Sequence, residues 1–279
     1  MISYRCNGGR LGENISYLYG LFKFAKNNGL DFKNIKIDFK YKNIPCSVDD
    51  KPQSVFLDNI DMFENVNYIF DNSFDYSVYN QISLYGKYDI ANFYNFYVLN
   101  NIDRTSNIMF SDYWSLCDYW VNKNGVDIRL LKYICFPNHI YKKLYKKYKD
   151  ILFNSLSIHV RRGDFLCIDD KSLVNKDIRD RYDVYFTSDK KLYTKNDIIK
   201  VIEEKIKQYN SILLFSDDIK WCQDNFDIYK NVYCIRNKKS YEDMLLMSMC
   251  TDVFPNPGSF FSKISTILNK FSNYEKKNT

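Results

Sequence analysis

The sequence lacks the patterns that mark a zinc protein, a membrane-spanning protein or a repeat protein. Eight cysteines and two histidines occur among 279 residues, but there is no Cys-x-x-Cys pair and neither histidine stands at zinc-ligand spacing from a cysteine. No apolar run approaches the length of a membrane span, and there is no internal repeat, low-complexity tract or Gly/Ser linker. These absences leave a globular chain, long enough for one large domain or two of ordinary size.

Charge and cysteine usage indicate the kind of partner and the compartment. The net charge of +6 is spread along the chain without a solid basic block. Such a mild bias favours anionic small ligands or an acidic membrane surface and is too diffuse to indicate nucleic acid. Several cysteines stand inside apolar runs and are expected to be buried free thiols. Because Met1 runs directly into a strand-like segment, we expect a reducing, cytoplasmic location.

The first 39 residues are typical of a strand, a glycine-rich turn, a helix and a second strand. Residues 1–6 alternate, residues 7–12 contain three glycines, and apolar residues then recur at helical spacing as far as Ala25. Asn28 and Gly29 predict the end of that helix. Residues 35–39 alternate again, whereas residues 45–125 show weak periodicity and are expected to mix short helices and loops.

Strands and helices alternate more clearly in the second half, which predicts a parallel, doubly wound α/β sheet. A Ser-x-x-Asp capping box is expected to open the helix at Ser240. The predicted strands are residues 156–160, 211–215, 232–235 and 252–254, and the predicted helices are residues 141–148, 196–208, 218–225, 240–250 and 259–271.

The helix predicted over residues 141–148 carries tyrosine and leucine on one face and four lysines on the other. A basic amphipathic helix of this kind can lie on a membrane surface. It is more often packed on a protein core with its lysines in water. Both interpretations stay open, so peripheral membrane contact is one expectation.

Two arginines follow the predicted strand at residues 156–160, within the run Ser-Ile-His-Val-Arg-Arg-Gly-Asp at residues 157–164. Ligands of open α/β sheets bind beyond the carboxyl ends of the strands. Guanidinium groups there present a rigid fork of donors that matches phosphate oxygens. The pattern therefore predicts a site for a phosphate-bearing ligand. The alternative is a strand end whose Arg and Asp side chains pair with each other.

Four segments, in order, resemble the α1,2-fucosyltransferase family, glycosyltransferase family 11, within the His-x-Arg-Arg-x-Asp fucosyltransferase superfamily. Residues 9–14 resemble the family's Gly-Arg-Leu-Gly-Asn-Gln, and residues 159–164 carry the signature itself. Residues 213–218 resemble its strand ending in Ser-Asp-Asp, and residues 242–248 its acidic Leu-Met-Ser helix. An Asn-x-x-Ser-Phe-like turn follows at residues 256–260, without the Ser-Trp-Trp common in bacterial members.

The resemblance implies the GT-B fold, with two facing Rossmann-like lobes that contain parallel sheets. An acceptor-side lobe would span residues 1–150 and a lobe that binds the GDP-sugar residues 151–279. The implied reaction is inverting transfer of L-fucose from GDP-β-L-fucose to a glycan hydroxyl, most readily α1,2 to galactose, with no metal or other cofactor and no nucleic-acid partner. The alternatives are another GDP-deoxyhexose donor, or a sugar- or nucleotide-binding protein without turnover.

The signature carries the residues that the resemblance assigns to the donor diphosphate. Arg161 would bind the pyrophosphate and support catalysis, and Arg162 would assist it. His159 would lie near the nucleotide, and Asp164 would brace the arginines. Asp218 is the candidate acceptor for the guanine N–H groups.

The remaining assignments concern the two ends of the chain and the catalytic base. Either Ser259 or Ser262 would offer a hydroxyl to a phosphate, at the start of a helix whose N–H groups attract anions. An inverting transfer needs a base for the acceptor proton. Asp169 is the first candidate by its position after the signature, and Glu13, where the family has asparagine, is the alternative. The first glycine loop adds three donor-binding candidates, Gly9, Gly12 and Asn14.

Overall fold

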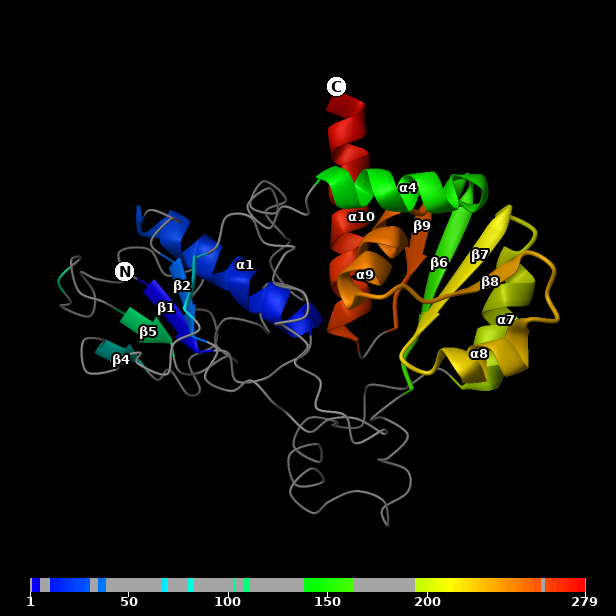
Figure 1. Ribbon diagram of the computed structural model, residues 1–279, viewed down its shortest axis with the longest axis horizontal. Helices are drawn as coiled ribbons and strands as arrows, with labels where there is room; N and C mark the ends of the chain where they lie inside the picture. The colour runs from blue at the N-terminus through cyan, green and yellow to red at the C-terminus, as the bar shows by residue number, and fades with distance from the viewer. Residues whose placement is uncertain are drawn as a thin grey trace, which may run out of the picture. The chain divides into compact units, whose positions relative to one another are not determined.

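Two parallel sheets organise the chain, each in its own compact unit (Figure 1). The structure is a computed structural model that describes residues 2–5, 11–30, 35–38, 67–69, 80–82, 103, 108–110, 138–162, 194–256 and 259–278. The first unit comprises residues 1–44 and 54–137, and the second comprises residues 45–53 and 138–279. The division therefore falls at residue 138, where the sequence placed it near 150, because helix α4 (Asn138–Leu152) packs with the second unit.

The first unit contains a parallel sheet with strand order β3-β2-β1-β5-β4. The predicted opening is confirmed, with a strand, β1, followed by a helix, α1. The bounds are β1 Ile2–Arg5, α1 Leu11–Asn27, β2 Ile35–Asp38, β3 Asn67–Ile69, β4 Asn80–Ile82 and β5 Ile108–Phe110. The last three strands, three residues each, lie where weak periodicity had predicted only short helices and loops. Runs this short carry too few alternating positions to be recognised.

Helix α1 is buried on nearly every side and ends where the sequence predicted. Tyr19, Phe22 and Phe24 are among its fully buried side chains. The N–H of Leu30 donates to the carbonyl of Ala25 at 2.9 Å, and Gly29 between them has φ +65°. Glycine adopts this left-handed conformation without steric cost, so it closes the helix.

The second unit contains a parallel sheet with strand order β8-β7-β6-β9. Together with the first sheet it confirms the predicted α/β class. The strands are β6 Ser155–Val160, β7 Ser211–Ser216, β8 Val232–Ile235 and β9 Asp252–Phe254, and the helices after α4 are α7 Lys195–Lys205, α8 Ile219–Phe226, α9 Ser240–Met249 and α10 Phe260–Asn278. Among the residues that the structure describes, no helix is long and apolar enough to cross a membrane.

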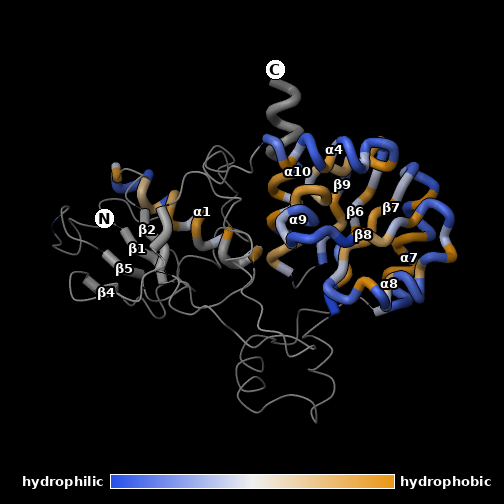
Figure 2. The backbone as a smooth tube through the Cα atoms, in the orientation of Figure 1, coloured by the Kyte–Doolittle hydropathy of each residue, from blue (hydrophilic) through white to orange (hydrophobic). Residues whose placement is uncertain are grey.

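The two central strands of this sheet, β6 and β7, are buried on both faces (Figure 2). Leu156, Ile158 and Val160 alternate toward one face and pack in a cluster that includes residues of α7 and α8. Ser157 points to the opposite face, where its hydroxyl lies 3.2 Å from the carbonyl of Met247 in α9. β7 contains the continuous apolar run that is typical of a central strand covered on both sides, whereas β6 alternates apolar residues with serine and histidine. Both patterns are typical of strands, so the sequence identified both.

Helix α9 begins one residue earlier than a Ser240 cap would require, so the predicted Ser-x-x-Asp capping box is wrong. The N-cap is Lys239, and its backbone N–H donates to the Glu242 carboxylate at 3.3 Å. Asp243 instead accepts from the backbone N–H and the side-chain amide of Asn237, at 3.0 and 2.9 Å. Burial raises the pKa of Asp243 to about 6, although these hydrogen bonds act to lower it.

We expect Asp243→Asn to change how stability depends on pH. Since the native pKa is raised, the native state holds the proton more tightly than the unfolded state does, and this stabilisation is lost as pH rises through about 6. Asparagine keeps an acceptor oxygen for Asn237 and does not ionise. As the pH rises from acidic to slightly alkaline values, the free energy of unfolding of the variant should therefore increase relative to that of the wild type by on the order of 1 to 3 kcal/mol. Urea unfolding of both proteins at several pH values measures this difference, and parallel pH profiles would contradict it.

Candidate active site

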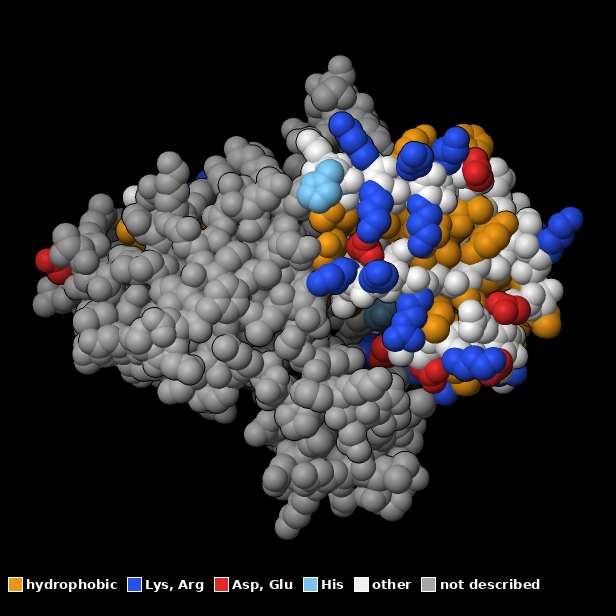
Figure 3. Space-filling model, viewed as in Figure 1, with side chains coloured by type: hydrophobic (Ala, Val, Ile, Leu, Met, Phe, Trp, Pro, Cys, Tyr) orange, Lys and Arg blue, Asp and Glu red, His pale blue; other side chains and the backbone are white. Residues whose placement is uncertain are grey.

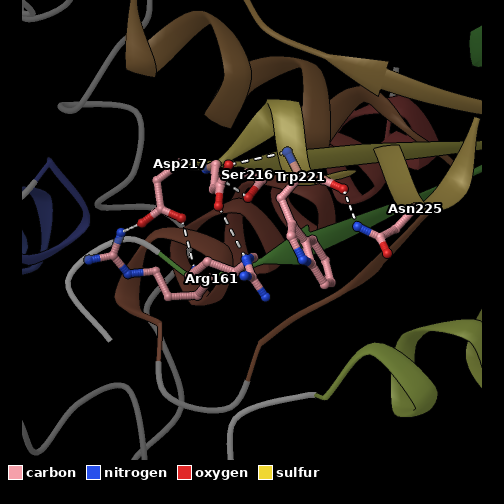
Figure 4. A network of polar contacts seen from close by, with 7 residues as sticks. Arg161, Ser216, Asp217, Trp221 and Asn225 are labelled. Carbon is pink, nitrogen blue, oxygen red and sulfur yellow. Dashed lines mark hydrogen bonds and ion pairs between the residues drawn. The ribbon is translucent and has the colours of Figure 1, made fainter. Parts of the chain in front are cut away.

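The register of β6 and β7 brings two charged pairs to the same edge of the sheet. Val160, the last residue of β6, pairs with Ser216, the last residue of β7. Arg161 and Arg162 follow one strand, and Asp217 and Asp218 follow the other. Because the strands are parallel and in register, the arginines meet the aspartates at the carboxyl edge (Figure 4).

Asp217 contacts both arginines. Its Oδ2 forms an ion pair with Nη1 of Arg161, and its Oδ1 accepts the backbone N–H of Arg162 at 2.9 Å. Only 9% of the Arg161 side chain and 24% of the Asp217 side chain are exposed. A charge-assisted contact with this little solvent holds a guanidinium in place more firmly than a surface ion pair does.

Arg162 is held by both a carboxylate and an aromatic ring. Its Nε donates to Oδ2 of Asp218 at 3.3 Å, and its Cζ lies 3.6 Å from the centroid of the Trp221 ring. This is a cation–π contact, and the stacked geometry suits the planar guanidinium. Both arginines are thus oriented by residues that follow β7.

The start of α8 fixes these supporting residues. Oδ1 of Asp218 accepts the backbone N–H of Trp221 at 3.2 Å and so caps the helix. Oγ of Ser216 accepts the Asp218 backbone N–H at 3.0 Å. The Trp221 ring meets Phe226 edge to face, with centroids 5.4 Å apart, and Asn225 donates to the Trp221 carbonyl at 2.7 Å (Figure 4).

His159 and the two candidate serines lie toward the α10 side of the sheet. His159 is buried, and its ring lies 5.2 Å from that of Phe261 at 31°. Oγ of Ser262 accepts the Asn256 backbone N–H at 3.0 Å and lies 3.2 Å from the Ser259 carbonyl. Ser262 is fully buried, Ser259 is also buried, and the Ser262 hydroxyl is engaged in the turn that opens α10. Both serines remain candidates for a phosphate contact.

Other predicted site residues lie outside what the structure describes. Gly9, Asp164 and Asp169 fall in that part of the chain, as do the side chains of Glu13 and Asn14. Gly12 is described, but it lies inside α1, where its carbonyl accepts the Ser16 hydroxyl at 2.8 Å. The glycine-rich turn predicted to reach residue 12 therefore ends earlier, since α1 begins at Leu11.

Two residues of this site were not predicted to contact the arginines. Asp217 was predicted, together with Asp218, only as part of the Ser-Asp-Asp segment and as a possible cap of the following helix, and Trp221 only as a helix residue. The signal for Asp217 is its place directly after a buried strand that neighbours the arginine-bearing one. Trp221 stands three residues after the helix cap, which puts it on the first turn of α8 beside that cap.

The alternative interpretation of the motif, a pairing of its own Arg and Asp side chains, involves Asp164, which lies outside the described residues. The ion pairs that the structure shows join the arginines to Asp217 and Asp218, which follow the neighbouring strand. Among the described residues no group of three or more His, Cys, Asp or Glu side chains could hold a metal ion. Cys222 in α8 is buried, and burial raises the pKa of its thiol to about 11, so it is not an activated nucleophile.

Comparison with known proteins places this arrangement in a class and a family. The chain has the fold of the crystal structure of POFUT1 in complex with GDP, with a TM-score of 0.54 and 13% identity, over 96% of this chain and 93% of that chain. NodZ α-1,6-fucosyltransferase soaked with GDP-fucose gives a TM-score of 0.52 and 13% identity, over 96% and 92%. The fold class is therefore GT-B, as the sequence predicted.

Within that class, residues 138–270 of the chain match the sequence model of glycosyl transferase family 11. These residues make up nearly all of the second unit and contain both arginines and both aspartates. The O-antigen biosynthesis glycosyltransferase WbnK of Escherichia coli is 32% identical over 120 residues, which cover 42% of this chain. The match spans only 34% of the length of WbnK. The family resemblance stated from the sequence is thus confirmed.

We expect Asp217→Ala to destabilise the protein by about 1 to 3 kcal/mol, because it leaves the nearly buried Arg161 charge without this carboxylate. The matched control is Asp224→Ala. Asp224 pairs with Lys220 at 2.6 Å, but 56% and 78% of the two side chains are exposed. An exposed pair contributes little, so the control should change the free energy of unfolding by less than about 0.5 kcal/mol. Chemical denaturation of both variants measures the difference, and equal losses would show that Asp217 has no special role.

Proposed function

We propose that this protein is an inverting glycosyltransferase that moves L-fucose from GDP-β-L-fucose to a glycan hydroxyl, with O2 of galactose as the favoured acceptor. Its match to the family 11 model over residues 138–270 supports the transferase class. Two solved structures of the same fold, POFUT1 in complex with GDP and NodZ soaked with GDP-fucose, support the choice of donor. The cytoplasm stays the predicted location.

The observation that carries the proposal is the pair of oriented guanidinium groups at the carboxyl edge of the central strands. When the bond from the fucose anomeric carbon to GDP breaks, the leaving diphosphate gains negative charge. Cations that are already in position stabilise that charge without having to reorganise. Arg161, held by Asp217, and Arg162, held by Asp218 and Trp221, meet this requirement.

The aspartates keep the arginines available without neutralising them fully. A guanidinium has five N–H donors in a planar fork, more than one carboxylate can accept. The proposal therefore has the diphosphate bind Arg161 alongside Asp217, with Arg162 assisting. The cationic side chains would also supply the charge that a divalent ion supplies in other sugar-nucleotide enzymes, so we propose a metal-independent reaction.

The other donor contacts are assigned by the same reasoning. The Asp218 side chain is 34% exposed, and each carboxylate oxygen has a second lone pair beyond its contact with Trp221 or Arg162. We propose that the Asp218 carboxylate accepts hydrogen bonds from the guanine N–H groups. Ser259 or Ser262, at the start of α10, would donate its hydroxyl to a phosphate. His159 would support the nucleotide site from beneath, where it packs on Phe261.

The acceptor hydroxyl must lose its proton as it attacks the anomeric carbon from the face opposite GDP. This step needs a positioned carboxylate or similar base. Asp169 remains the first candidate and Glu13 the second, with Asp164 as a brace for the arginines. Gly9, Gly12 and Asn14 remain candidates for contacts with the donor from the first unit.

Turnover of GDP-fucose with lactose and N-acetyllactosamine, in the presence of EDTA, tests the proposal. We expect fucosylated product from the wild type, with no loss of rate on chelation. Arg161→Ala should lower kcat by roughly 100-fold or more, the usual effect of removing a preorganised electrostatic contact. Arg236→Ala is the matched control, because Arg236 is exposed and follows the edge strand β8 as Arg161 follows β6. Its rate should stay close to that of the wild type.

The products separate the parts of the proposal. A product cleaved by an α1,2-specific fucosidase supports O2 of galactose, and a resistant product shows another linkage. Release of GDP without a glycan product supports GDP-fucose as the donor and contradicts lactose and N-acetyllactosamine as acceptors. If GDP-fucose neither binds nor turns over, the donor assignment fails.

A further inference from the structure

Helix α4 presents a basic stripe to solvent while its other face is packed on the second unit. Ile140, Leu144 and Leu152 are buried. Three lysines on the opposite side, Lys142, Lys146 and Lys149, are exposed. Their spacing of four and three residues puts them on one line along the helix, and Asp150, exposed beside this line, is the single acidic residue of α4. Figure 3 shows lysine and arginine side chains gathered over this part of the second unit.

Two other lysines, Lys143 and Lys147, contact the rest of the second unit, so the stripe lysines are not needed to hold the helix in place. Nζ of Lys143 lies 2.6 Å from the carboxylate of Glu242, a side chain only 7% exposed. Nζ of Lys147 and the hydroxyl of Tyr148 both donate to Oδ1 of Asn237, at 3.2 and 2.8 Å. Within the described part of the chain, none of the three stripe lysines forms an ion pair.

A large apolar side chain continues the stripe. Phe153 follows Lys149 by four residues and is 78% exposed, and Tyr145 on the edge of the same face is 58% exposed. Exposed aromatic side chains among lysines are the combination that binds the boundary between lipid headgroups and acyl chains. An isolated exposed aromatic needs no explanation, but here it ends a row of three cations.

Phe153 is held on a fixed turn. Asn154 adopts φ 49°, a left-handed conformation that ends the helix, and its side-chain amide donates to the Gln208 carbonyl at 3.1 Å. The Asn154 carbonyl accepts the Asn210 backbone N–H at 2.8 Å. The turn is thereby tied to the loop before β7, so Phe153 is displayed at a defined position.

We propose that the α4 stripe, formed by Lys142, Lys146, Lys149 and Phe153, docks on an anionic lipid surface. The lysines attract the headgroups, and Phe153 enters the interface beside them. The turn at residues 153–154 leads into the amino end of β6, whereas Arg161 follows its carboxyl end. Six residues of strand separate the two by about 20 Å, so the stripe can bind lipid while the arginine edge stays clear of it.

Sedimentation with phosphatidylcholine vesicles, with and without phosphatidylglycerol, tests this proposal. The wild type should bind only the anionic vesicles, and less at high salt. Lys142→Glu with Lys146→Glu and Lys149→Glu should lower the partition coefficient by more than roughly tenfold. Phe153→Ser should weaken binding by roughly threefold to tenfold while the salt dependence stays unchanged.

The matched control reverses three other exposed lysines, Lys195, Lys200 and Lys230. It makes the same change in net charge, so retained binding in this variant supports the α4 stripe. An equal loss in both triple variants would reduce the effect to net charge and overturn the proposal. Failure of the wild type to bind anionic vesicles would overturn it too, as would stripe-dependent binding of nucleic acid in its place. Unchanged thermal unfolding midpoints establish that each variant is folded.

Discussion

The in-register pairing of β6 with β7 is the constraint on which the site depends. It aligns Val160 with Ser216, so the next two residues of each strand are neighbours in space. Opposite charges then meet without a long loop to position them, and Asp217 can bind both the Arg161 guanidinium and the Arg162 backbone. A shift of one residue would turn the apolar residues of β6 to the wrong face of a sheet that is buried on both sides. Burial of the core therefore also fixes the relation between the arginines and the aspartates.

Residues after β7 serve the fold and the site together. Asp218 caps α8 and binds Arg162, while Trp221 packs on Phe226 and stacks under the same guanidinium. Phe226, a residue of the buried core, thus packs against the Trp221 ring, and that ring orients the Arg162 guanidinium. This coupling holds the Arg162 guanidinium in a defined position even though arginine side chains are long, as the proposed diphosphate site requires. Rigidity matters because an electrostatic contact accelerates a reaction only when it costs no reorganisation as charge develops.

Much of the second unit could be predicted from the sequence, because β7 contains a continuous apolar run, β6 alternates apolar and polar residues, and most of the helices are amphipathic. The arginine motif was found because it directly follows the recognisable strand β6. The contacts of Asp217 and Trp221 with the arginines were not predicted, because they depend on which strands are neighbours, and local patterns carry no such information. The start of α9 was misplaced because both Ser240 and Lys239 precede an acidic residue by three positions. In the first unit, strands of three residues left too little periodicity to detect.

The central claim is that the oriented arginines bind the diphosphate of the donor. Calorimetric titration of GDP and of guanosine into the wild type and Arg161→Ala tests it most directly, because the two ligands differ only in the diphosphate. The account predicts that the wild type binds GDP more tightly than guanosine and that the variant loses most of this difference while its affinity for guanosine is kept. A variant that still prefers GDP by the same factor would contradict the account.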